Sequence, residues 1–302
     1  MCHSREVNTT GKEVAFDVVV VGSANLDLVA TLDHLPKPGE TIVALDYAEH
    51  AGGKGVNQAV ACARMGARTA FVGCVGNDDA GIFLRGVLEN EGIDTTMLRV
   101  VDMPTGRAFI NVDSRGENEI VVVSGANTQV GVAQNPLVLP TSRVLLMQLE
   151  IPLETVSAAL TLARKSGTLT VLNPAPYKSL TDDVLSLVDV IVPNETESAA
   201  CGGTNALLKA GVATVVTTLG EKGAVINTAS SETSIAPHKV VAVDTVGAGD
   251  AFIGALSAEL ARGAAISDAA SVGAVAGALA TTVHGAVPSL PKQDVVRKAM
   301  GK

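Results

Sequence analysis

The feature that most constrains this chain is an alternation of short valine-rich runs with alanine-rich amphipathic stretches. The run at 17–22, Asp-Val-Val-Val-Val-Gly, is continuously apolar and ends in glycine, as is typical of a strand buried in a parallel sheet. The stretch 152–165 instead repeats its apolar residues with a helical period, and Gly167 follows it as a helix C-cap. This alternation predicts an α/β fold in which a mainly parallel sheet carries helices on both faces. Further strands are expected at 144–149, 169–173, 188–192 and 214–218, and a second helix at 55–65.

Two segments break this alternation. Residues 28–47 and 105–124 have the pattern of strands with no helix between them, and turn residues at 113–116 predict a hairpin. We expect a small second sheet built from two insertions, at about 28–50 and 105–124, within an α/β domain that spans 16–302 after a polar tail at 1–15. Such a sheet could cover a ligand or pair with another subunit, and an ordinary extension of the sheet edge fits the pattern equally well.

Charge and composition exclude several classes of function. The chain has 302 residues, with 22 Lys and Arg against 31 Asp and Glu, and its net charge of −9 argues against a nucleic-acid surface and against a polybasic membrane patch. No run of about 18 apolar residues occurs, so no membrane span is expected. Residues 1–13 lack the apolar core of a secretory signal, and no two of the cysteines form a C-x-x-C pair. We therefore expect a cytoplasmic protein with reduced cysteines.

The most informative motif lies at 243–252, Val-Asp-Thr-Val-Gly-Ala-Gly-Asp-Ala-Phe. We expect a strand at 238–243, then a glycine-rich turn, then a helix with Phe252, Leu256 and Leu260 on one face. Free N–H groups at the start of such a helix form an anion hole. A carboxylate at Asp250 is unfavourable for simple phosphate binding, but it suits a base that takes a proton from a hydroxyl attacking the phosphate. The alternative is an acidic residue placed only for the helix dipole.

Further polar clusters follow other expected strands. The motif at 52–59, Gly-Gly-Lys-Gly-Val-Asn-Gln-Ala, is not a Walker A loop because Gly55 follows Lys54, and it is either an anion-binding turn or a plain glycine-rich turn. Asn25 and Asp27 are two residues apart, so they share a side of an extended chain and suit sugar hydroxyls, with an Asx turn as the alternative. Together with the clusters at 148–150, 193–197 and 218–223, these residues are expected at one edge of the sheet.

At these residues the chain resembles the ribokinase family of carbohydrate kinases, also called the phosphofructokinase B family. The resemblance covers about 17–291 and includes both family signatures, at 52–63 and at 244–252, of which the second is highly specific. It implies a ribokinase-like α/β fold with a small β-sheet lid, and an ATP-dependent kinase reaction. The segments that are most similar to the D-ribose-specific members are 25–27, 36–41, 173–176 and 194–197.

The resemblance also implies a role for each matching position. Asp250 would take the proton from the primary hydroxyl of the sugar, and the N–H groups of Gly247, Ala248 and Gly249 would stabilise the transferring phosphoryl group. Glu197 would act on Mg²⁺ through water, and the lid would join two subunits into a homodimer. The remaining positions fall into three groups: Asn25, Asp27, Gly53, Lys54, Asn57, Glu150 and Asp250 for the sugar; Asn194, Thr218, Gly220, Glu221, Lys222, Gly223 and Gly249 for ATP; and Asp244, Val246, Ala280, Val283, Gly285 and Ser289 for an activating K⁺.

The chain departs from the family pattern after Glu197, where it reaches the next strand early, so a helix on the nucleotide side is expected to be short. Other functions stay open. Another kinase of the family could act on deoxyribose, fructose or adenosine, and a catalytically silent sugar-binding sensor could share the fold. The presence of Asp250 argues against the silent sensor, because such a relative could lose the base.

Overall fold

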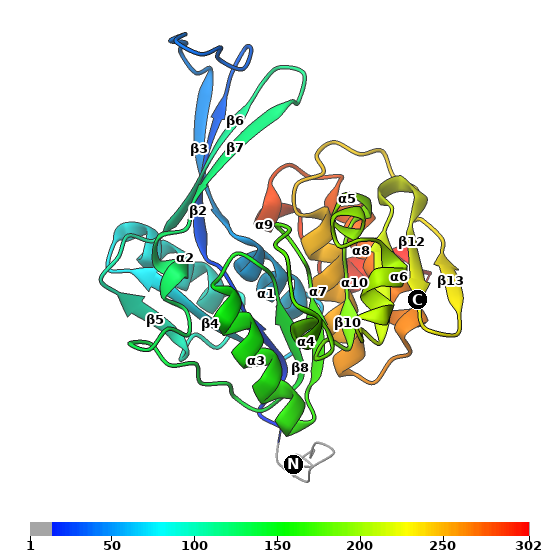
Figure 1. Ribbon diagram of the computed structural model, residues 1–302. Helices are drawn as coiled ribbons and strands as arrows, with labels where there is room; N and C mark the ends of the chain where they lie inside the picture. Colours follow the sequence, from blue (N-terminus) through cyan, green and yellow to red (C-terminus); the bar gives the residue numbers. More distant parts are fainter. Residues whose placement is uncertain (1–13, 302) are drawn as a thin grey trace.

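The computed structural model describes residues 14–301, in which a nine-stranded main sheet has the order β13-β12-β11-β10-β9-β8-β1-β4-β5 (Figure 1). All neighbouring strands from β11 to β5 pair in parallel, whereas β12 pairs antiparallel with β11 and the edge strand β13 pairs antiparallel with β12. The predicted polar tail falls almost wholly on residues 1–13, outside the described residues. The strands are β1 Phe16–Val21, β4 Thr69–Gly76, β5 Leu98–Val101, β8 Ser142–Met147, β9 Leu169–Leu172, β10 Val190–Ile191, β11 Thr214–Thr218, β12 Ala224–Asn227 and β13 Glu232–Ile235.

Helices cover both faces of this sheet. Successive valines of β1 alternate between two cores: Val18 and Val20 belong to one core, and Val19 and Val21 belong to the other. Among residues 14–301, no helix is both long enough and apolar enough to cross a membrane. The first core contains residues of α1 Lys54–Arg64, α2 Asp79–Asn90, α7 Ala248–Ala261, α8 Ile266–Ala280 and α10 Gln293–Ala299, and the second contains residues of α3 Leu153–Ser166, α4 Asp182–Leu185, α6 Thr204–Lys209 and the short 3₁₀ helix η1 Gly125–Gln129.

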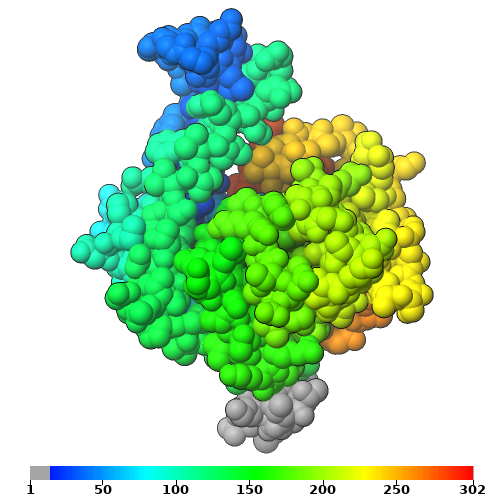
Figure 2. Space-filling view, viewed as in Figure 1, coloured from blue at the N-terminus to red at the C-terminus, as the bar shows by residue number. Residues whose placement is uncertain are grey.

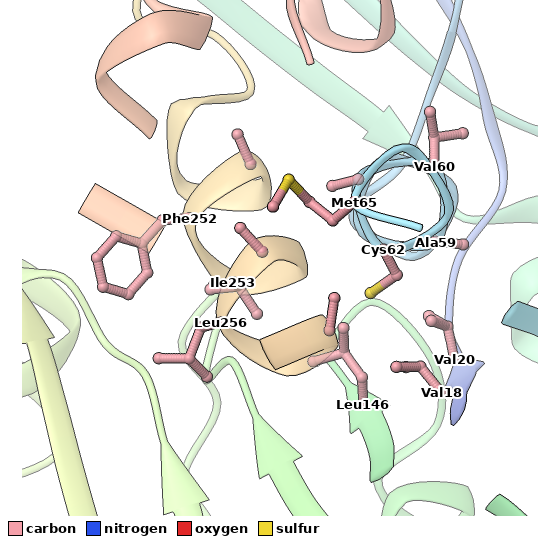
Figure 3. Packing of buried hydrophobic residues seen from close by; sticks show 14 of the residues in the cluster. Val18, Val20, Ala59, Val60, Cys62, Met65, Leu146, Phe252, Ile253 and Leu256 are labelled. Atoms are coloured by element: carbon pink, nitrogen blue, oxygen red, sulfur yellow. The ribbon is translucent and has the colours of Figure 1, made fainter. Parts of the chain in front are cut away.

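The packing of α1 against α7 decides where the site forms. Figure 3 shows the two helices side by side, with the Met65 side chain at the end of α1 extending toward α7. A Cβ atom on Gly254 would overlap the side chain of Ala61, so the helices approach closely only because position 254 is glycine. One turn earlier along each helix lie Asp250 and the residues that face it.

A small separate sheet has the order β3-β2-β6-β7 and stands out from the body of the molecule (Figures 1 and 2). Its strands are β2 Asn25–Thr31, β3 Asp46–Gly52, β6 Gly106–Val112 and β7 Asn118–Val123. β2 pairs antiparallel with β3 and parallel with β6, and β6 forms with β7 the hairpin that the turn at 113–116 predicts. The expected fold class, a mainly parallel sheet with helices on both faces and a small second sheet, is confirmed.

The strand predicted at 238–243 is wrong. The edge strand β13 ends at Ile235, Pro237 cannot donate a backbone hydrogen bond, and the residues that follow are irregular. Val241 is 86% exposed, and the N–H groups of Val243 and Asp244 donate to the carbonyl oxygen of Thr281 rather than to a strand. The apolar run therefore borders a cavity instead of entering the sheet.

The short helix expected after Glu197 is present. α5 Glu195–Ala200 and α6 Thr204–Lys209 have six residues each. Two further short helices, η2 Gly220–Lys222 and α9 Ala286–Ser289, complete the elements that border the site.

Candidate active site

Asp250 lies in the first turn of α7 and is only 8% exposed. Its Oδ2 accepts a hydrogen bond from Nδ2 of Asn57 at 2.9 Å, and its Oδ1 accepts one from Nε2 of Gln58 at 2.8 Å. Both donors come from α1, which the contact at Gly254 holds close to α7. Two neutral amide groups therefore hold a buried carboxylate that can still accept a proton.

The turn before α7 exposes backbone donors. Gly247 has a left-handed conformation, with φ 79°, and a Cβ atom there would come within 3.1 Å of Cα of Ala286. The N–H group of Ala248 makes a long bond of 3.3 Å to the carbonyl oxygen of Thr245. Within the described residues, the N–H group of Gly249 has no backbone acceptor. The start of this 14-residue helix is thus suited to an anion.

Glu150 fastens the glycine-rich turn at 52–55 to the end of β1. Its Oε2 accepts from Oγ of Ser23 at 2.5 Å and from the backbone N–H of Lys54 at 3.0 Å. Oγ of Ser23 also accepts from the N–H of Gly55 at 3.2 Å. A Cβ atom on Gly55 would meet the backbone of Ser23 at 2.5 Å, so glycine is needed at this approach.

Asn25 and Asp27 begin β2, on the same side of the strand. Oδ1 of Asn25 accepts from Nδ2 of the buried Asn127 at 2.7 Å, and Oδ1 of Asn127 accepts from the N–H of Ala24 at 2.8 Å. The carboxylate of Asp27 extends over Gly52 of the neighbouring strand, where any Cβ atom would overlap it. Gly53 continues the turn with φ 83°. The structure thus brings the predicted sugar-binding residues to the root of the small sheet.

Several charged side chains interact electrostatically at the root of the small sheet. They are the carboxylates of Asp27, Glu150, Glu197 and Asp250 and the ammonium group of Lys54. Burial raises the pKa of Asp27 to about 7, and the charges of Glu150 and Asp250 add to the shift. Burial alone would lower the pKa of Lys54, but Asp250, Glu150 and Glu197 outweigh it and raise that pKa. Lys54 is therefore a positive charge among carboxylates, and one of these carboxylates, Asp27, is only partly ionised at neutral pH.

A cavity of about 780 Å³ opens next to the start of α7. Its lining includes Thr218, Gly220, Glu221 and Gly223, which the resemblance assigns to ATP, and also Ala248 and Gly249. Figure 2 shows the surface hollowed between the small sheet and the C-terminal half of the chain. The apolar part of the lining includes Pro237, Val240, Ala242, Phe252, Ala274, Gly277 and Ala278.

Two residues that were expected to bind the nucleotide, Asn194 and Lys222, are not among the described residues that line this cavity. Asn194 lies beside Thr218 through a β-bridge and caps α5. Its Oδ1 accepts from the N–H of Glu197 at 2.8 Å, and Oε2 of Glu197 accepts from the N–H of Asn194 at 2.9 Å. The cap leaves Nδ2 of Asn194 and Oε1 of Glu197 available to a ligand.

Asp244 joins two loops beside the anion-binding turn. Its Oδ1 accepts from the N–H of Val246 at 2.9 Å, and its Oδ2 accepts from the N–H of Gly285 at 2.8 Å. Oγ of Ser289 donates to the carbonyl oxygen of Ala286 at 2.8 Å. The other predicted cation residues, Ala280 and Val283, bring only backbone oxygens to this region.

Sequence reasoning assigned no role to five polar side chains that position the site. A polar residue directly after a buried strand is a usable signal, and Ser23, Gln148 and Asn173 each stand one or two positions beyond β1, β8 and β9. Gln58 lies inside a recognised motif. Asn127 has no such signal, because it sits in a 3₁₀ helix about 100 residues from the strand that it holds.

The sequence of this chain is similar to those of known carbohydrate kinases. The family model of pfkB family carbohydrate kinases matches residues 15–293. A relative called ribokinase from Haemophilus influenzae is 40% identical over 92% of this chain and 96% of its own. A relative called deoxyribokinase from Salmonella typhi is 35% identical over 79% of this chain and 83% of its own.

Solved structures agree with this result. A ribokinase from Thermotoga maritima has a TM-score of 0.87 and 36% identity, and the match covers 94% of this chain and 99% of that one. A ribokinase from Arabidopsis thaliana, solved in complex with ribose and ATP, has a TM-score of 0.84 and 31% identity, over 94% of this chain and 98% of that one. With the helix-start carboxylate, the glycine-rich turns and the strand-end polar residues on one edge of the sheet, the chain belongs to the pfkB family of carbohydrate kinases.

Proposed function

We propose that this chain transfers the γ-phosphoryl group of ATP to the primary hydroxyl of D-ribose, giving ribose 5-phosphate and ADP. The observation that carries the proposal is the position of Asp250, between the polar residues at the root of the small sheet and the cavity of about 780 Å³. Relatives called ribokinase, and the neighbour that holds ribose and ATP, support the substrate pair.

Asp250 acts as the general base in this proposal. The hydroxyl proton passes to the carboxylate while the hydroxyl oxygen forms a bond to the γ-phosphorus. The bond from this phosphorus to the bridging oxygen breaks, and ADP leaves with the electron pair. Gly247, Ala248 and Gly249 offer N–H groups to the oxygens on which charge accumulates.

Asp27 is the residue that would select the sugar. Among the described residues no hydrogen-bond donor acts on its carboxylate, so both oxygens can accept from neighbouring hydroxyls. Asn57 adds a buried Oδ1 without a partner in the described part of the chain. Asn25, Gly53, Lys54 and Glu150 complete the sugar site.

The donor sets fit the expected metal ions, because they consist of hard oxygen atoms. Mg²⁺ bound to the phosphates would be approached through water by Oε1 of Glu197, which the helix cap leaves available. K⁺ would be held by oxygens of Asp244, Val246, Ala280, Val283, Gly285 and Ser289. When bound, Mg²⁺ would neutralise charge on the phosphates, and K⁺ would stabilise the turn before α7.

The insertions at about 28–50 and 105–124 are proposed as a lid that covers the sugar and joins two copies of the chain. The thiols of Cys62, Cys74 and Cys201 are free, which suits the reducing conditions of the cytoplasm.

A comparison of sugars tests the substrate. We expect kcat/KM to be highest for ribose, lower for 2-deoxyribose and lower for fructose, because the deoxy sugar leaves an oxygen of Asp27 unpaired. Asp27→Ala should reduce kcat/KM for ribose more than for 2-deoxyribose. An enzyme that prefers fructose, or treats ribose and deoxyribose alike, would contradict the assignment of ribose.

Asp250→Asn tests the base. We expect kcat to fall about 10²–10⁴-fold, as is usual when a general base is lost. Ribose affinity, measured by calorimetry without ATP, should stay close to that of the parent, since the amide keeps the shape of the carboxylate. Near-parent turnover would exclude Asp250 as the base.

A further inference from the structure

Asp250 is connected to buried amide side chains that the proposed reaction does not use. Nε2 of Gln58 donates to Oδ1 of Asp250 at 2.8 Å and also to Oδ1 of Asn173 at 3.2 Å. Oε1 of Gln58 accepts from Nε2 of Gln148 at 2.6 Å, and Nδ2 of Asn173 donates to the carbonyl oxygen of Val192 at 3.0 Å. Gln58 and Gln148 are fully buried and Asn173 is 5% exposed. We call Asn173, Gln58 and Gln148 the amide relay.

The contact between Asn173 and the backbone of Val192 fixes which way each amide group of the amide relay is turned. The carbonyl oxygen of Val192 can only accept, so Asn173 turns its NH₂ group toward it and its oxygen toward Gln58. Gln58 must then present its own NH₂ group to Asn173 and Asp250, because the reversed amide would set its oxygen against two acceptors. The amide relay therefore always offers a donor to Oδ1 of Asp250.

The two carboxylate oxygens of Asp250 have different surroundings. Among the described residues, Oδ1 accepts a hydrogen bond only from Gln58 of the buried amide relay. Oδ2 accepts one from Asn57, which belongs to the glycine-rich turn and helix of the proposed sugar site. We propose that Gln58 is a positioning residue, which holds Oδ1 of Asp250 so that the carboxylate cannot rotate and Oδ2 is the oxygen that receives the sugar proton. This inference rests on the proposed role of Asp250 as the base.

A double-mutant cycle between Gln58 and Asp250 tests the proposal. Gln58→Met keeps the length and burial of the side chain but removes the donor. We expect kcat to fall about 10–100-fold, since misplacing a catalytic group by about 1 Å can cost 10²-fold. KM for ribose should change less than about threefold, because the interaction acts on the chemical step. In the Asp250→Asn background, Gln58→Met should cost less than about twofold in kcat, since no base remains to be positioned.

Equal losses of kcat in both backgrounds would overturn the proposal, because a residue that only supports the fold acts independently of Asp250. If Asp250→Asn alone kept the parent kcat, the proposed function would fail and this inference with it. If Asp250→Asn shows the expected low kcat but Gln58→Met lowers kcat by the same factor in both backgrounds, only the role of Gln58 is overturned.

Two further variants guard against a loss of folding. Thr170→Val removes a buried hydroxyl that donates to the carbonyl oxygen of Leu187, so it should lower Tm without changing kcat. Gln58→Glu keeps an acceptor for Gln148 but sets an oxygen against Oδ1 of Asp250, and it should lower kcat more than Gln58→Met does. A Gln58→Glu variant with the parent kcat would overturn the proposal.

Discussion

At the scale of residues, Asp27 and Asp250 are two carboxylates in one pocket with different neighbours. Asp250 receives an amide donor on each oxygen, whereas Asp27 faces burial and the charges of Glu150 and Asp250. A carboxylate without donors becomes more acidic again when sugar hydroxyls bind it, because they stabilise its ionised form. Sugar binding and proton release from Asp27 are therefore linked.

This linkage predicts a pH dependence of sugar binding. The pKa of Asp27 is about 7 without sugar, so the carboxylate is mostly protonated at pH 6 and mostly ionised at pH 8. Ribose affinity should rise about tenfold between these two pH values, since one proton must leave before binding at low pH. Calorimetric titration with ribose alone measures it. The Asp27→Asn variant is the control and should show no such rise, although Glu150, Asp250 and Lys54 stay in place. The same slope in both proteins would contradict the prediction.

At the scale of elements, Asp244 connects the loop before α7 with the loop before α9. Its two oxygens accept from Val246 and from Gly285, and Gly247 packs against Ala286 of α9. The conformation of the anion-binding turn therefore depends on α9, which lies about 40 residues further along the chain. A cation bound between the two loops would stabilise this turn without touching the phosphate.

We therefore expect K⁺ to activate the enzyme more than Na⁺ does. Asp244→Asn should lower kcat in K⁺ buffer on the order of tenfold, less than the roughly 10²-fold cost of deleting an oxyanion donor, because the turn loosens but its N–H groups remain. Initial rates in K⁺, Na⁺ and cation-free buffer measure the effect. Equal initial rates of the parent enzyme in all three buffers would contradict the proposed cation site.

The sequence alone predicts elements whose signal lies in their own residues. β1, α3 and the hairpin of β6 and β7 were predicted because apolar period, glycine cap and turn residues are local properties. The strand predicted at 238–243 failed because a strand also needs a partner, and none is available to these residues. The same limit applies to the site. Gln58 and Asp250 are 192 residues apart, so their contact depends on how α1 packs against α7.

At the scale of the whole molecule, the small sheet leaves an apolar edge strand in solvent. In β7, Ile120, Val121, Val122 and Val123 are each about half exposed, and within residues 14–301 β7 has a neighbouring strand on one side only. Exposed apolar edge strands favour pairing with another chain. A second copy of the same chain would cover this strand by a symmetric contact.

We expect a dimer by light scattering at assay concentration. Val121→Lys should weaken the dimer at least about tenfold, the effect of losing roughly 1.4 kcal/mol at an interface. Val295→Lys is the matched control, because Val295 is equally apolar and 47% exposed but lies in α10. A monomeric parent protein, or equal effects of the two substitutions, would contradict the lid interface.

The strand β2 joins the proposed sugar-binding residues to the rest of the small sheet. Asn25 and Asp27 are its first and third residues, and the strand runs on to Thr31, paired along its whole length with β3 and β6. At about 3.3 Å per residue it reaches roughly 20 Å from the pocket. If the small sheet tilts as one body, the side chains of Asn25 and Asp27 tilt with it. A sugar bound to Asn25 and Asp27 would therefore act on the same continuous strand that carries the outer end of the small sheet.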